Sequence, residues 1–559
     1  MTERSGGLSR IAGRRRRHGH PITLELSRIL TAVLIAAGLL ASPLNRITPA
    51  GADVFTDLGV SWDGTSPLDP IVSCVPSGDC VVAVNPSPPS PAVQAGAQIV
   101  VVPRSAVFGS GNQTSSAPAV PAPPRSLGAN TSVAAIACFT TTRCEAAGYR
   151  DGVVVAASSG GGVWAISRVP GIPSQPWVST LPTEGIQLSC STPHLCGLVA
   201  PAMINGTVQP FVSVEVNGVW RTARPLAVPG YTGEGATACW HGGCTFVAGL
   251  IDASHAAEPY GIIAEFDGAR QAWQPSRSVP GIFLNAISCG APGVCVAAGA
   301  QYTTSTPLLV GLRDGTVLWE SAQSPSFLGR ATGASTNPYT LSPSVGCAPT
   351  GALCVVAFTY PALKPGSSAY EETRSWVATI AHGSSASAIV RASPLPDPGT
   401  VGATVTTTQC ESTRSASTCA VAGTDVPAQQ IPTAWGLVPA EGTFLVVTNG
   451  AEWHRAWGDT RPTGSTTITY DGSGATTQTT VAVAIEATLT LSGVAFGTGA
   501  CPAWVAMGSL DASVSSVTES PGVSGTPNSG DTWGNYIRTY ECGANSTKSV
   551  KARAAAPRR

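Results

Sequence analysis

The stretch that decides the fold is ISCGAPGVCVAAGA, residues 287–300, in which two cysteines flank a Gly/Pro turn and small apolar residues follow. This arrangement suits a β-hairpin, because facing residues of a hairpin lie close enough to form a disulfide. The small residues after the second cysteine suit a crowded inner strand. The same arrangement recurs along the chain, so the stretch defines a repeating unit.

Fourteen of the 16 cysteines form seven close pairs, and the first members of successive pairs lie 49 to 64 residues apart. A period of this length is typical of propellers, solenoids and arrays. We expect a disulfide within each pair, because zinc sites need two cysteine knuckles or histidines at fixed spacing and each pair here stands alone. The pairs are Cys74/Cys80, Cys138/Cys144, Cys190/Cys196, Cys239/Cys244, Cys289/Cys295, Cys347/Cys354 and Cys410/Cys419. The last two cysteines, Cys501 and Cys542, are also expected to be disulfide-bonded.

The remainder of each unit also recurs. A short apolar strand follows the second cysteine, and the next strand runs into a tight turn and an aromatic residue, as in VEVNGVW (214–220) and GLRDGTVLW (311–319). Asn-Gly and Asp-Gly tolerate positive φ, so they favour two-residue hairpin turns. In the first unit VVVPRSAVF (100–108) holds this place, with Phe108 instead of tryptophan. Four antiparallel strands per unit predict a propeller blade.

The chain as a whole is predicted to be all-β. It contains 62 Gly and 46 Pro in 559 residues, and these residues interrupt helices and punctuate strands. We expect a seven-bladed β-propeller over residues 53–457, a C-terminal β-rich extension over 458–547 and a basic tail over 548–559. Because GACPAWVAMGSLDAS (499–513) resembles GGCTFVAGLIDAS (242–254), a degenerate eighth blade is the alternative for the extension.

The N-terminal region has the layout of a secretory signal peptide. A basic cluster at Arg14 to Arg17 precedes an uncharged apolar run at 29–41, and small residues stand at Ala50 and Ala52. We therefore expect residues 1–52 to be removed and the mature protein to be secreted or at the cell surface, where disulfides persist. An uncleaved signal anchor is the alternative, although the run is shorter than the roughly 20 residues of a membrane span.

The charge balance argues against one class of partner. Residues 53–547 carry 18 basic and 30 acidic side chains, a formal charge of −12. A surface of this sign does not attract phosphate backbones, so nucleic acid is excluded as the expected ligand. We expect a monomer whose partner is an extracellular protein or glycan.

Two resemblances follow from these motifs. The units, with their SC-turn-CVAVG and NG-x-W segments, resemble the disulfide-hairpin propeller repeats of secreted actinobacterial proteins over roughly residues 55–457. This resemblance implies the architecture and no activity. TPNSGDTW (526–533) is similar to the Asp-box of sialidases and other propellers, with Asn528 in place of the usual Asp. In those families the box is a structural hairpin turn.

No motif identifies a catalytic site, a cofactor or a metal. The sequence has no GxSxG elbow, no phosphate-binding glycine loop and no EF-hand spacing. A sialidase-like enzyme needs an arginine cluster and a Tyr/Glu pair, and the one compact stretch of that composition is Tyr370 to Arg374, which we interpret as a solvated hairpin turn. The other residues considered are the turn residues His194 and His241, the histidines without identifiable partners His255, His382 and His454, and the expected packing residues Trp453 and Trp457.

Three functions remain open. The first is a non-catalytic propeller that binds a protein or glycan through loops on one face. The second is an extracellular sialidase-like glycoside hydrolase or lyase, and the third is a structural component of an envelope or matrix. We favour the first, because loops on a rigid scaffold commonly carry binding residues. The longest and least repetitive loops are 110–132 and 324–344.

Overall fold

The structure is a computed structural model. It describes residues 56–57, 67–75, 79–86, 96–102, 125–174, 185–227, 231–252, 259–290, 293–301, 306–323, 342–363, 370–381, 388–395, 403–412, 417–425, 430–433, 436–451, 453–462, 464–471, 478–497, 503–518 and 532–541. The expected signal peptide, the basic tail and the cysteines Cys501 and Cys542 lie outside these ranges. The described residues form strands and turns and contain no helix.

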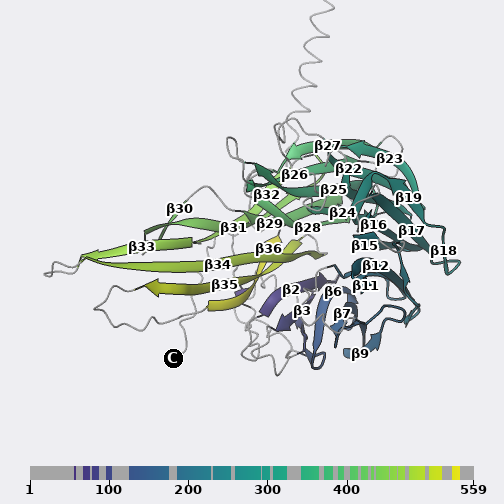
Figure 1. The fold of residues 1–559 in the computed structure, drawn as a ribbon, viewed down its shortest axis with the longest axis horizontal. Helices are drawn as coiled ribbons and strands as arrows, with labels where there is room; N and C mark the ends of the chain where they lie inside the picture. Colours follow the sequence, from purple (N-terminus) through teal and green to yellow (C-terminus); the bar gives the residue numbers. More distant parts are fainter. Residues whose placement is uncertain are drawn as a thin grey trace, which may run out of the picture. The chain divides into compact units, whose positions relative to one another are not determined.

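Each of the first four repeats forms one antiparallel sheet (Figure 1). Within each sheet, the first four strands are hydrogen-bonded neighbours in chain order. Blade 1 contains β2 (Pro67–Cys74), β3 (Cys80–Pro86), β4 (Gln98–Val102) and β5 (Arg125–Ser126). Blade 2 contains β6 (Thr131–Thr140), β7 (Arg143–Arg150), β8 (Val153–Gly160) and β9 (Val163–Arg168). Blade 3 contains β10 (Gln187–Thr192), β11 (Leu195–Ile204), β12 (Thr207–Val216), β13 (Val219–Trp220) and β14 (Arg224–Pro225). Blade 4 contains β15 (Tyr231–Trp240), β16 (Gly243–Asp252), β17 (Tyr260–Asp267), β18 (Ala272–Trp273) and β19 (Arg277–Pro280).

The next three repeats follow the same plan. Blade 5 contains β20 (Ile282–Cys289), β21 (Val294–Gln301), β22 (Thr306–Arg313) and β23 (Thr316–Ala322). Blade 6 contains β24 (Ser342–Cys347), β25 (Leu353–Leu363), β26 (Tyr370–Ala381) and β27 (Ile389–Pro394). Blade 7 contains β28 (Ala403–Ser412), β29 (Ser417–Asp425), β30 (Gln430–Thr433), β31 (Gly436–Thr448) and β32 (Trp453–Pro462). The predicted seven-bladed propeller of four-stranded antiparallel units is confirmed; in blades 3 and 4 the fourth strand is split in two, and blade 7 has the additional strand β30.

The predicted C-terminal β-rich extension is a further antiparallel sheet. It contains β33 (Gly464–Asp471), β34 (Gln478–Gly497), β35 (Ala503–Thr518), β36 (Thr532–Glu541) and the N-terminal strand β1 (Thr56–Asp57), which pairs with β36. The first strands of successive blades contact one another from β2 to β28, and β34 contacts both β2 and β28. The extension therefore lies between the last blade and the first.

The seven cysteine pairs of the repeats are all disulfides in the structure. In each blade the two cysteines stand directly opposite each other on the first two strands, with Cα atoms 3.9 to 4.1 Å apart across the set. This pairing fixes the register of the first hairpin in every blade. The bonds join Cys74 to Cys80, Cys138 to Cys144, Cys190 to Cys196, Cys239 to Cys244, Cys289 to Cys295, Cys347 to Cys354 and Cys410 to Cys419.

The second cysteine of each pair is also a residue of the hydrophobic core, which the sequence analysis did not predict. It assigned these residues only to a disulfide beside a turn. In the structure the second strand of each blade is covered on both faces, so a residue at its start is already shielded from water. The buried second cysteines are Cys80, Cys144, Cys196, Cys244, Cys295, Cys354 and Cys419, each at most 2% exposed.

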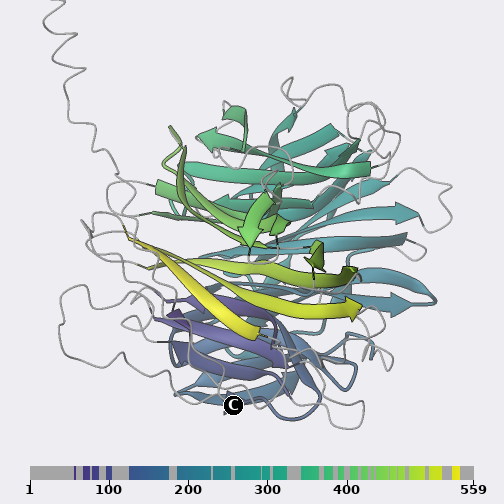
Figure 2. The same cartoon turned by 90° about the vertical axis from the view of Figure 1, so that its left-hand side faces the viewer.

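The register also decides which side chains face which neighbour. Successive residues of a strand point to opposite faces of the sheet. In blades 2 to 7 the second cysteine packs against the preceding blade, as Cys244 packs with Val199 and Val212 of blade 3. The next residue faces the following blade, as Thr245 does where its hydroxyl lies 3.6 Å from Cys295 Sγ. Figure 2 shows the successive sheets stacked on one another.

Three pairs of adjacent blades, 1 and 2, 3 and 4, and 5 and 6, are also joined by a hydrogen bond between their first strands. The backbone N–H of the first cysteine of a blade donates to the hydroxyl of the serine that precedes the first cysteine of the blade before it. Cys138 donates to Ser73 at 2.9 Å, and the equivalent bonds are Cys239 to Ser189 at 2.9 Å and Cys347 to Ser288 at 3.0 Å. The Ser-Cys dipeptide of blades 1, 3 and 5 therefore satisfies a backbone donor of the next blade.

Tryptophans of the fourth strands lie between neighbouring blades, where large side chains fill the gaps. Trp164, Trp220, Trp273, Trp319 and Trp453 each pack on a hydrophobic cluster shared by two neighbouring blades. The ring of Trp319 is only half-buried and covers Gly311, where a β-carbon would have no room.

A different tryptophan is the most completely buried. Trp376 on β26 is fully buried, and its ring stacks on Phe358 with centroids 4.6 Å apart. It was not among the fourth-strand aromatics predicted for blade packing, because it lies on a third strand.

One detail of the repeat differs from the prediction. The two-residue turn holds at Asn217–Gly218 and Asp314–Gly315, where all four residues have positive φ, but Asp267–Gly268 and Asn449–Gly450 begin longer loops. Asp267 Oδ1 accepts hydrogen bonds from the N–H groups of residues 269 and 270, which stabilises the longer loop. In blade 1 the strand that pairs with the outer edge of β4 is β5, through Arg125 and Ser126, and Phe108 lies outside the described residues.

We predict that peptide mapping without reduction will recover seven disulfides, each within one hairpin. Closing loops of this length should contribute about 2 kcal/mol each in the chain-entropy model. A bond between cysteines of different blades, such as Cys80 to Cys138, would contradict the repeat.

We predict that Trp376→Ala lowers the free energy of unfolding by about 3–5 kcal/mol, because it empties a fully buried site. Trp319→Ala should cost less, since part of that ring is already exposed to water. Denaturant unfolding of the two variants tests the order, and equal losses would show that burial does not decide the cost.

Candidate functional site

A short acidic motif occurs in blades 3 and 4, at the hairpin that joins the third strand to the fourth. It reads Glu-Val-Asn-Gly from Glu215 and Glu-Phe-Asp-Gly from Glu265. In blade 3 Glu215 stands opposite Cys196, whereas in blade 4 Glu265 stands opposite Thr245. Because these partners point to opposite faces of their sheets, Glu215 faces the preceding blade and Glu265 faces the following one.

The shift arises from the hairpin loop. In blade 3 the strand ends at Val216 and a two-residue turn follows. In blade 4 the strand continues through Asp267, which pairs with Ala272, and residues 268–271 form the loop. Asp267 is therefore the last residue of its strand. As a result Glu265, two positions earlier, pairs one residue further along the second strand than Glu215 does in blade 3.

The acids of blades 2 and 3 that face each other form a polar cluster, whose outer residues Arg143 and His194 are exposed. Glu145, which follows the second cysteine of blade 2, is buried and accepts a hydrogen bond of 2.7 Å from the Ser158 hydroxyl. Glu215 is also buried and accepts a hydrogen bond from the Gly218 N–H. Arg143 lies 3.2 Å from His194 Nε2. The pKa of Glu145 is raised to about 7, because burial and, to a smaller extent, the nearby Glu215 raise it more than Ser158 and Arg143 lower it.

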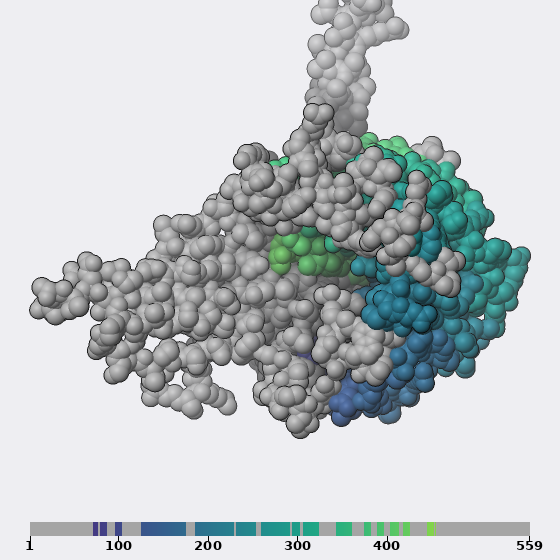
Figure 3. Space-filling model, in the orientation of Figure 1, coloured from purple at the N-terminus to yellow at the C-terminus, as the bar shows by residue number. Residues whose placement is uncertain are grey.

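Glu265 instead lines an open pocket of about 510 Å³ between blades 4 and 5. The described surface of these blades is the blue to teal region of Figure 3. Carboxylates and arginines form much of the wall, and apolar side chains complete it. The lining residues used below are Trp240, Ile263, Glu265, Asp267, Arg270, Gln274, Pro275, Arg277, Asp314 and Gly315.

The Glu265 carboxyl is the buried polar group of this pocket. The residue is only 8% exposed, and its side chain accepts no hydrogen bond from any residue that the structure describes. A β-carbon on Gly315 would lie 2.6 Å from its Oε2 atom, so the glycine of the blade 5 turn makes room for it. The pKa of Glu265 is raised to about 7, because burial and, to a smaller extent, Asp314 and Asp267 raise it more than Arg277 lowers it.

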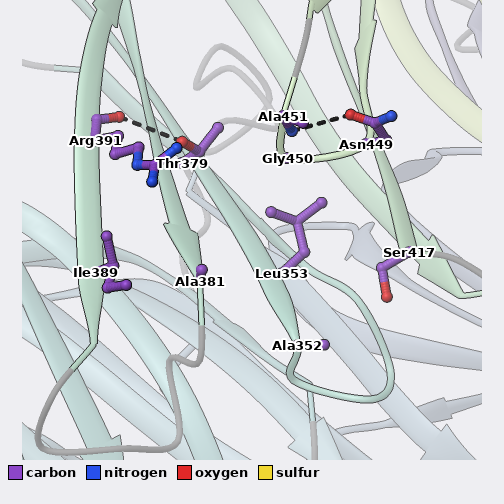
Figure 4. A pocket seen from close by; sticks show the side chains of 10 residues that line it. All are labelled: Ala352, Leu353, Thr379, Ala381, Ile389, Arg391, Ser417, Asn449, Gly450 and Ala451. Atoms are coloured by element: carbon purple, nitrogen blue, oxygen red, sulfur yellow. Dashed lines mark hydrogen bonds between the residues drawn. The ribbon is translucent and has the colours of Figure 1, made fainter. Parts of the chain in front are cut away.

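An equivalent pocket of about 500 Å³ lies between blades 6 and 7 (Figure 4). Thr379 occupies the register position of Glu265, and Asn449 and Gly450 occupy the turn positions of Asp314 and Gly315. Arg391 is the one charged residue in its wall. The same place in the repeat therefore carries a buried acid between blades 4 and 5 and a neutral hydroxyl between blades 6 and 7.

Metal and membrane chemistry are not indicated in the part of the chain that the structure describes. No group of three or more His, Cys, Asp or Glu residues there could hold a metal ion. Within the same residues no helix is long and apolar enough to cross a membrane. The seven disulfides indicate an oxidising environment.

The cysteines named from the sequence have a structural place and do not line either pocket. Cys144 packs in the hydrophobic cluster shared by blades 1 and 2, Cys354 in that of blades 5 and 6, and Cys419 in that of blades 6 and 7. Each is buried as well as disulfide-bonded, so its sulfur belongs to the packing between blades. These residues hold the scaffold, and the pocket residues are others.

The stretch considered for sialidase-like chemistry is not a turn. Tyr370 to Arg374 form the start of β26, where Arg374 pairs with Tyr360, so the predicted solvated turn is wrong. Strand β25 continues to Leu363, and this extended pairing places the stretch within the sheet. The described first strands, which contact one another around the ring, contain no lysine or arginine. They do not build the arginine cluster that such an enzyme needs.

Other residues named from the sequence fall in several places. His194 lies in the cluster of blades 2 and 3, while His241 lies in a cystine turn. The Asp-box-like segment is described only from Thr532, at the start of β36. Residues 110–124 and 324–341 of the two long loops, and the histidines His255 and His382, lie outside the described residues. Only the backbone of His454 and Trp457, on β32, is described.

Glu265 was not singled out from the sequence. Its motif looks like that of Glu215, and the signal that separates them is a three-residue insertion, ARQ (269–271), between the glycine of the motif and Ala272. An insertion of this kind changes the strand register, which a count of motif residues does not show.

Comparison with known proteins shows likeness of fold only. No family model and no curated protein matches the chain. Among solved structures it is similar to a prolyl endopeptidase at 10% identity, with a TM-score of 0.39 over 86% of this chain and 58% of that chain. It is similar to the Dos1 propeller at 10% identity, with a TM-score of 0.39 over 87% of this chain and 95% of that chain. It is also similar to a subtype N11 neuraminidase-like protein of A/flat-faced bat/Peru/033/2010 (H18N11) at 12% identity, with a TM-score of 0.35 over 72% of this chain and 95% of that chain. The chain thus spans about 58% of the length of the first of these.

We predict that the free energy of unfolding falls as pH rises from about 4.5 to about 7. The carboxyls of Glu145 and Glu265 keep their protons in the folded state over this range, whereas the unfolded chain loses them, so the stability present at low pH is lost as pH rises. Glu145 should account for a loss on the order of 3 kcal/mol. The loss from Glu265 should be smaller, because its carboxyl opens into a pocket where solvent screens it.

Denaturant unfolding across this pH range checks the effect. Glu145→Gln should remove its share of the slope and leave the folded protein more stable at pH above 7. Glu320→Gln, at an exposed position of β23, is the control and should keep the full slope. An unchanged slope in Glu145→Gln would contradict the assignment.

Proposed function

We propose that the protein is a secreted or cell-surface propeller that binds an extracellular protein or glycan without turnover. The observation that carries the proposal is the open polar pocket between blades 4 and 5, which the register shift of one hairpin creates on a disulfide-bonded scaffold. Pockets that bind ligands are concave and contain a few convergent polar groups. The ligand is held at the end of the blades where the loops between the third and fourth strands lie.

The disulfides support a binding role on physical grounds. They fix the first hairpin of each blade, so the turns that line the pocket need little ordering when a ligand binds. A preorganised site loses less conformational freedom on association. The contact surface is proposed to include this pocket in addition to the long loops favoured from the sequence.

We predict that the purified mature chain, screened on a glycan array and against extracellular proteins, retains a ligand through the pocket. Arg277→Ala together with Asp314→Ala should abolish retention while the protein remains folded. Arg391→Ala, in the equivalent pocket of blades 6 and 7, is the matched control and should retain the ligand.

The hydrolase or lyase alternative makes a different prediction. If the bound glycan released product over time and Glu265→Gln stopped the release with folding intact, the protein would be an enzyme. A screen without any ligand, combined with concentration-dependent self-association, would favour the structural alternative.

A further inference from the structure

The pocket between blades 4 and 5 contains a buried acid that lacks a partner. Glu265 is more than nine-tenths buried, and no described residue gives its carboxyl a hydrogen bond or an ion pair. The surroundings partly desolvate the side chain, but its carboxyl oxygens open into the pocket and are not sealed from water. A ligand that donates hydrogen bonds can therefore reach this carboxyl and supply the partners that the described residues do not.

The charge of the pocket favours a cationic donor. Asp267 is already engaged, because it accepts hydrogen bonds from its own loop and forms an ion pair of 3.5 Å with Arg270. Glu265 and Asp314 remain, and they face a single arginine, Arg277, across the pocket. The two acids therefore form an acceptor pair suited to an ammonium group, which carries three donors.

The rest of the wall distinguishes between sources of that ammonium group. A lysine side chain carries one polar group on an apolar stem. This pocket also offers donors from Arg277 and Gln274 and an apolar wall from Trp240, Ile263 and Pro275. Donors and acceptors on several sides suit a ring that bears hydroxyl groups around its amine.

We propose that this pocket binds an amino sugar of a glycan chain, with its protonated primary amine between Glu265 and Asp314. Arg277 and Gln274 donate hydrogen bonds to the hydroxyls of the same ring, and the apolar residues contact its C–H groups. The inference rests on the proposed binding function and names the ligand class for the same pocket.

Calorimetric titration of the mature chain with two oligosaccharides of equal length tests this inference. One is a glucosamine oligomer with free amines and the other is its N-acetylated counterpart, both at about pH 7, where an amine still carries its proton and the Glu265 carboxyl loses its own. The wild type should bind the free-amine oligomer about 30-fold or more tightly than the N-acetylated one, because loss of one member of a buried charge pair costs at least this much.

Two matched variants locate the contact. Glu265→Gln replaces the carboxyl with a neutral group of the same shape and should weaken binding of the free-amine oligomer by a similar factor. Glu145→Gln removes an equally buried acid outside the pocket and should leave the affinity unchanged. Thermal unfolding of both variants establishes that they are folded.

The possible outcomes separate the two proposals. Equal affinity for both oligomers, with loss in the Arg277→Ala/Asp314→Ala variant, would overturn the amine inference and leave the binding function standing. Binding of a lysine-rich peptide but of neither oligomer, again lost in Glu265→Gln, would replace the glycan with a protein partner. Absence of any pocket-dependent ligand here and in the wider screen would overturn the proposed function itself.

Discussion

Each blade depends on a disulfide that joins directly opposed residues of its first two strands. Because the two cysteines are partners in the register, the first hairpin cannot slip by one residue without breaking the bond. The second cysteine then faces the preceding blade, and alternation along the strand assigns every neighbouring side chain to one interface or the other. In blades 1, 3 and 5 the serine beside the first cysteine extends this order to the next blade by accepting a backbone hydrogen bond.

The same order explains how one motif yields two different environments. Glu215 shares a face with Cys196 and lies near the acid Glu145 of the blade before it, in a polar cluster without a pocket of the kind that Glu265 lines. Glu265 is displaced by one register position, shares a face with Thr245 and meets the turn of blade 5, where Gly315 leaves space. A local change of loop length thus turns a packed interface into an open pocket.

The places where blades depart from the repeat also contain side chains whose surroundings destabilise the folded protein. Buried acids with raised pKa values destabilise the folded protein at neutral pH, and an unpartnered one is hardest to explain by packing alone. The disulfides, the stacked Trp376 and Phe358 and the apolar clusters between blades supply stability that offsets this cost. On such a stable scaffold a carboxyl that binds a ligand can remain without a hydrogen-bond partner until the ligand supplies one.

The sequence by itself determined the repeat, the cysteine pairs within it, the four-stranded blades and the β-rich C-terminal region. These follow from local spacing, because a disulfide hairpin and a Gly-containing turn are properties of a few consecutive residues. It did not reveal that Asp267 belongs to a strand, that Tyr370 to Arg374 lie in a sheet or that Glu265 faces blade 5. Those facts depend on strand register and on which blade lies across the interface. Register is set by hydrogen bonds between distant residues, so only the tertiary structure decided where the pocket formed and which acid was buried in it.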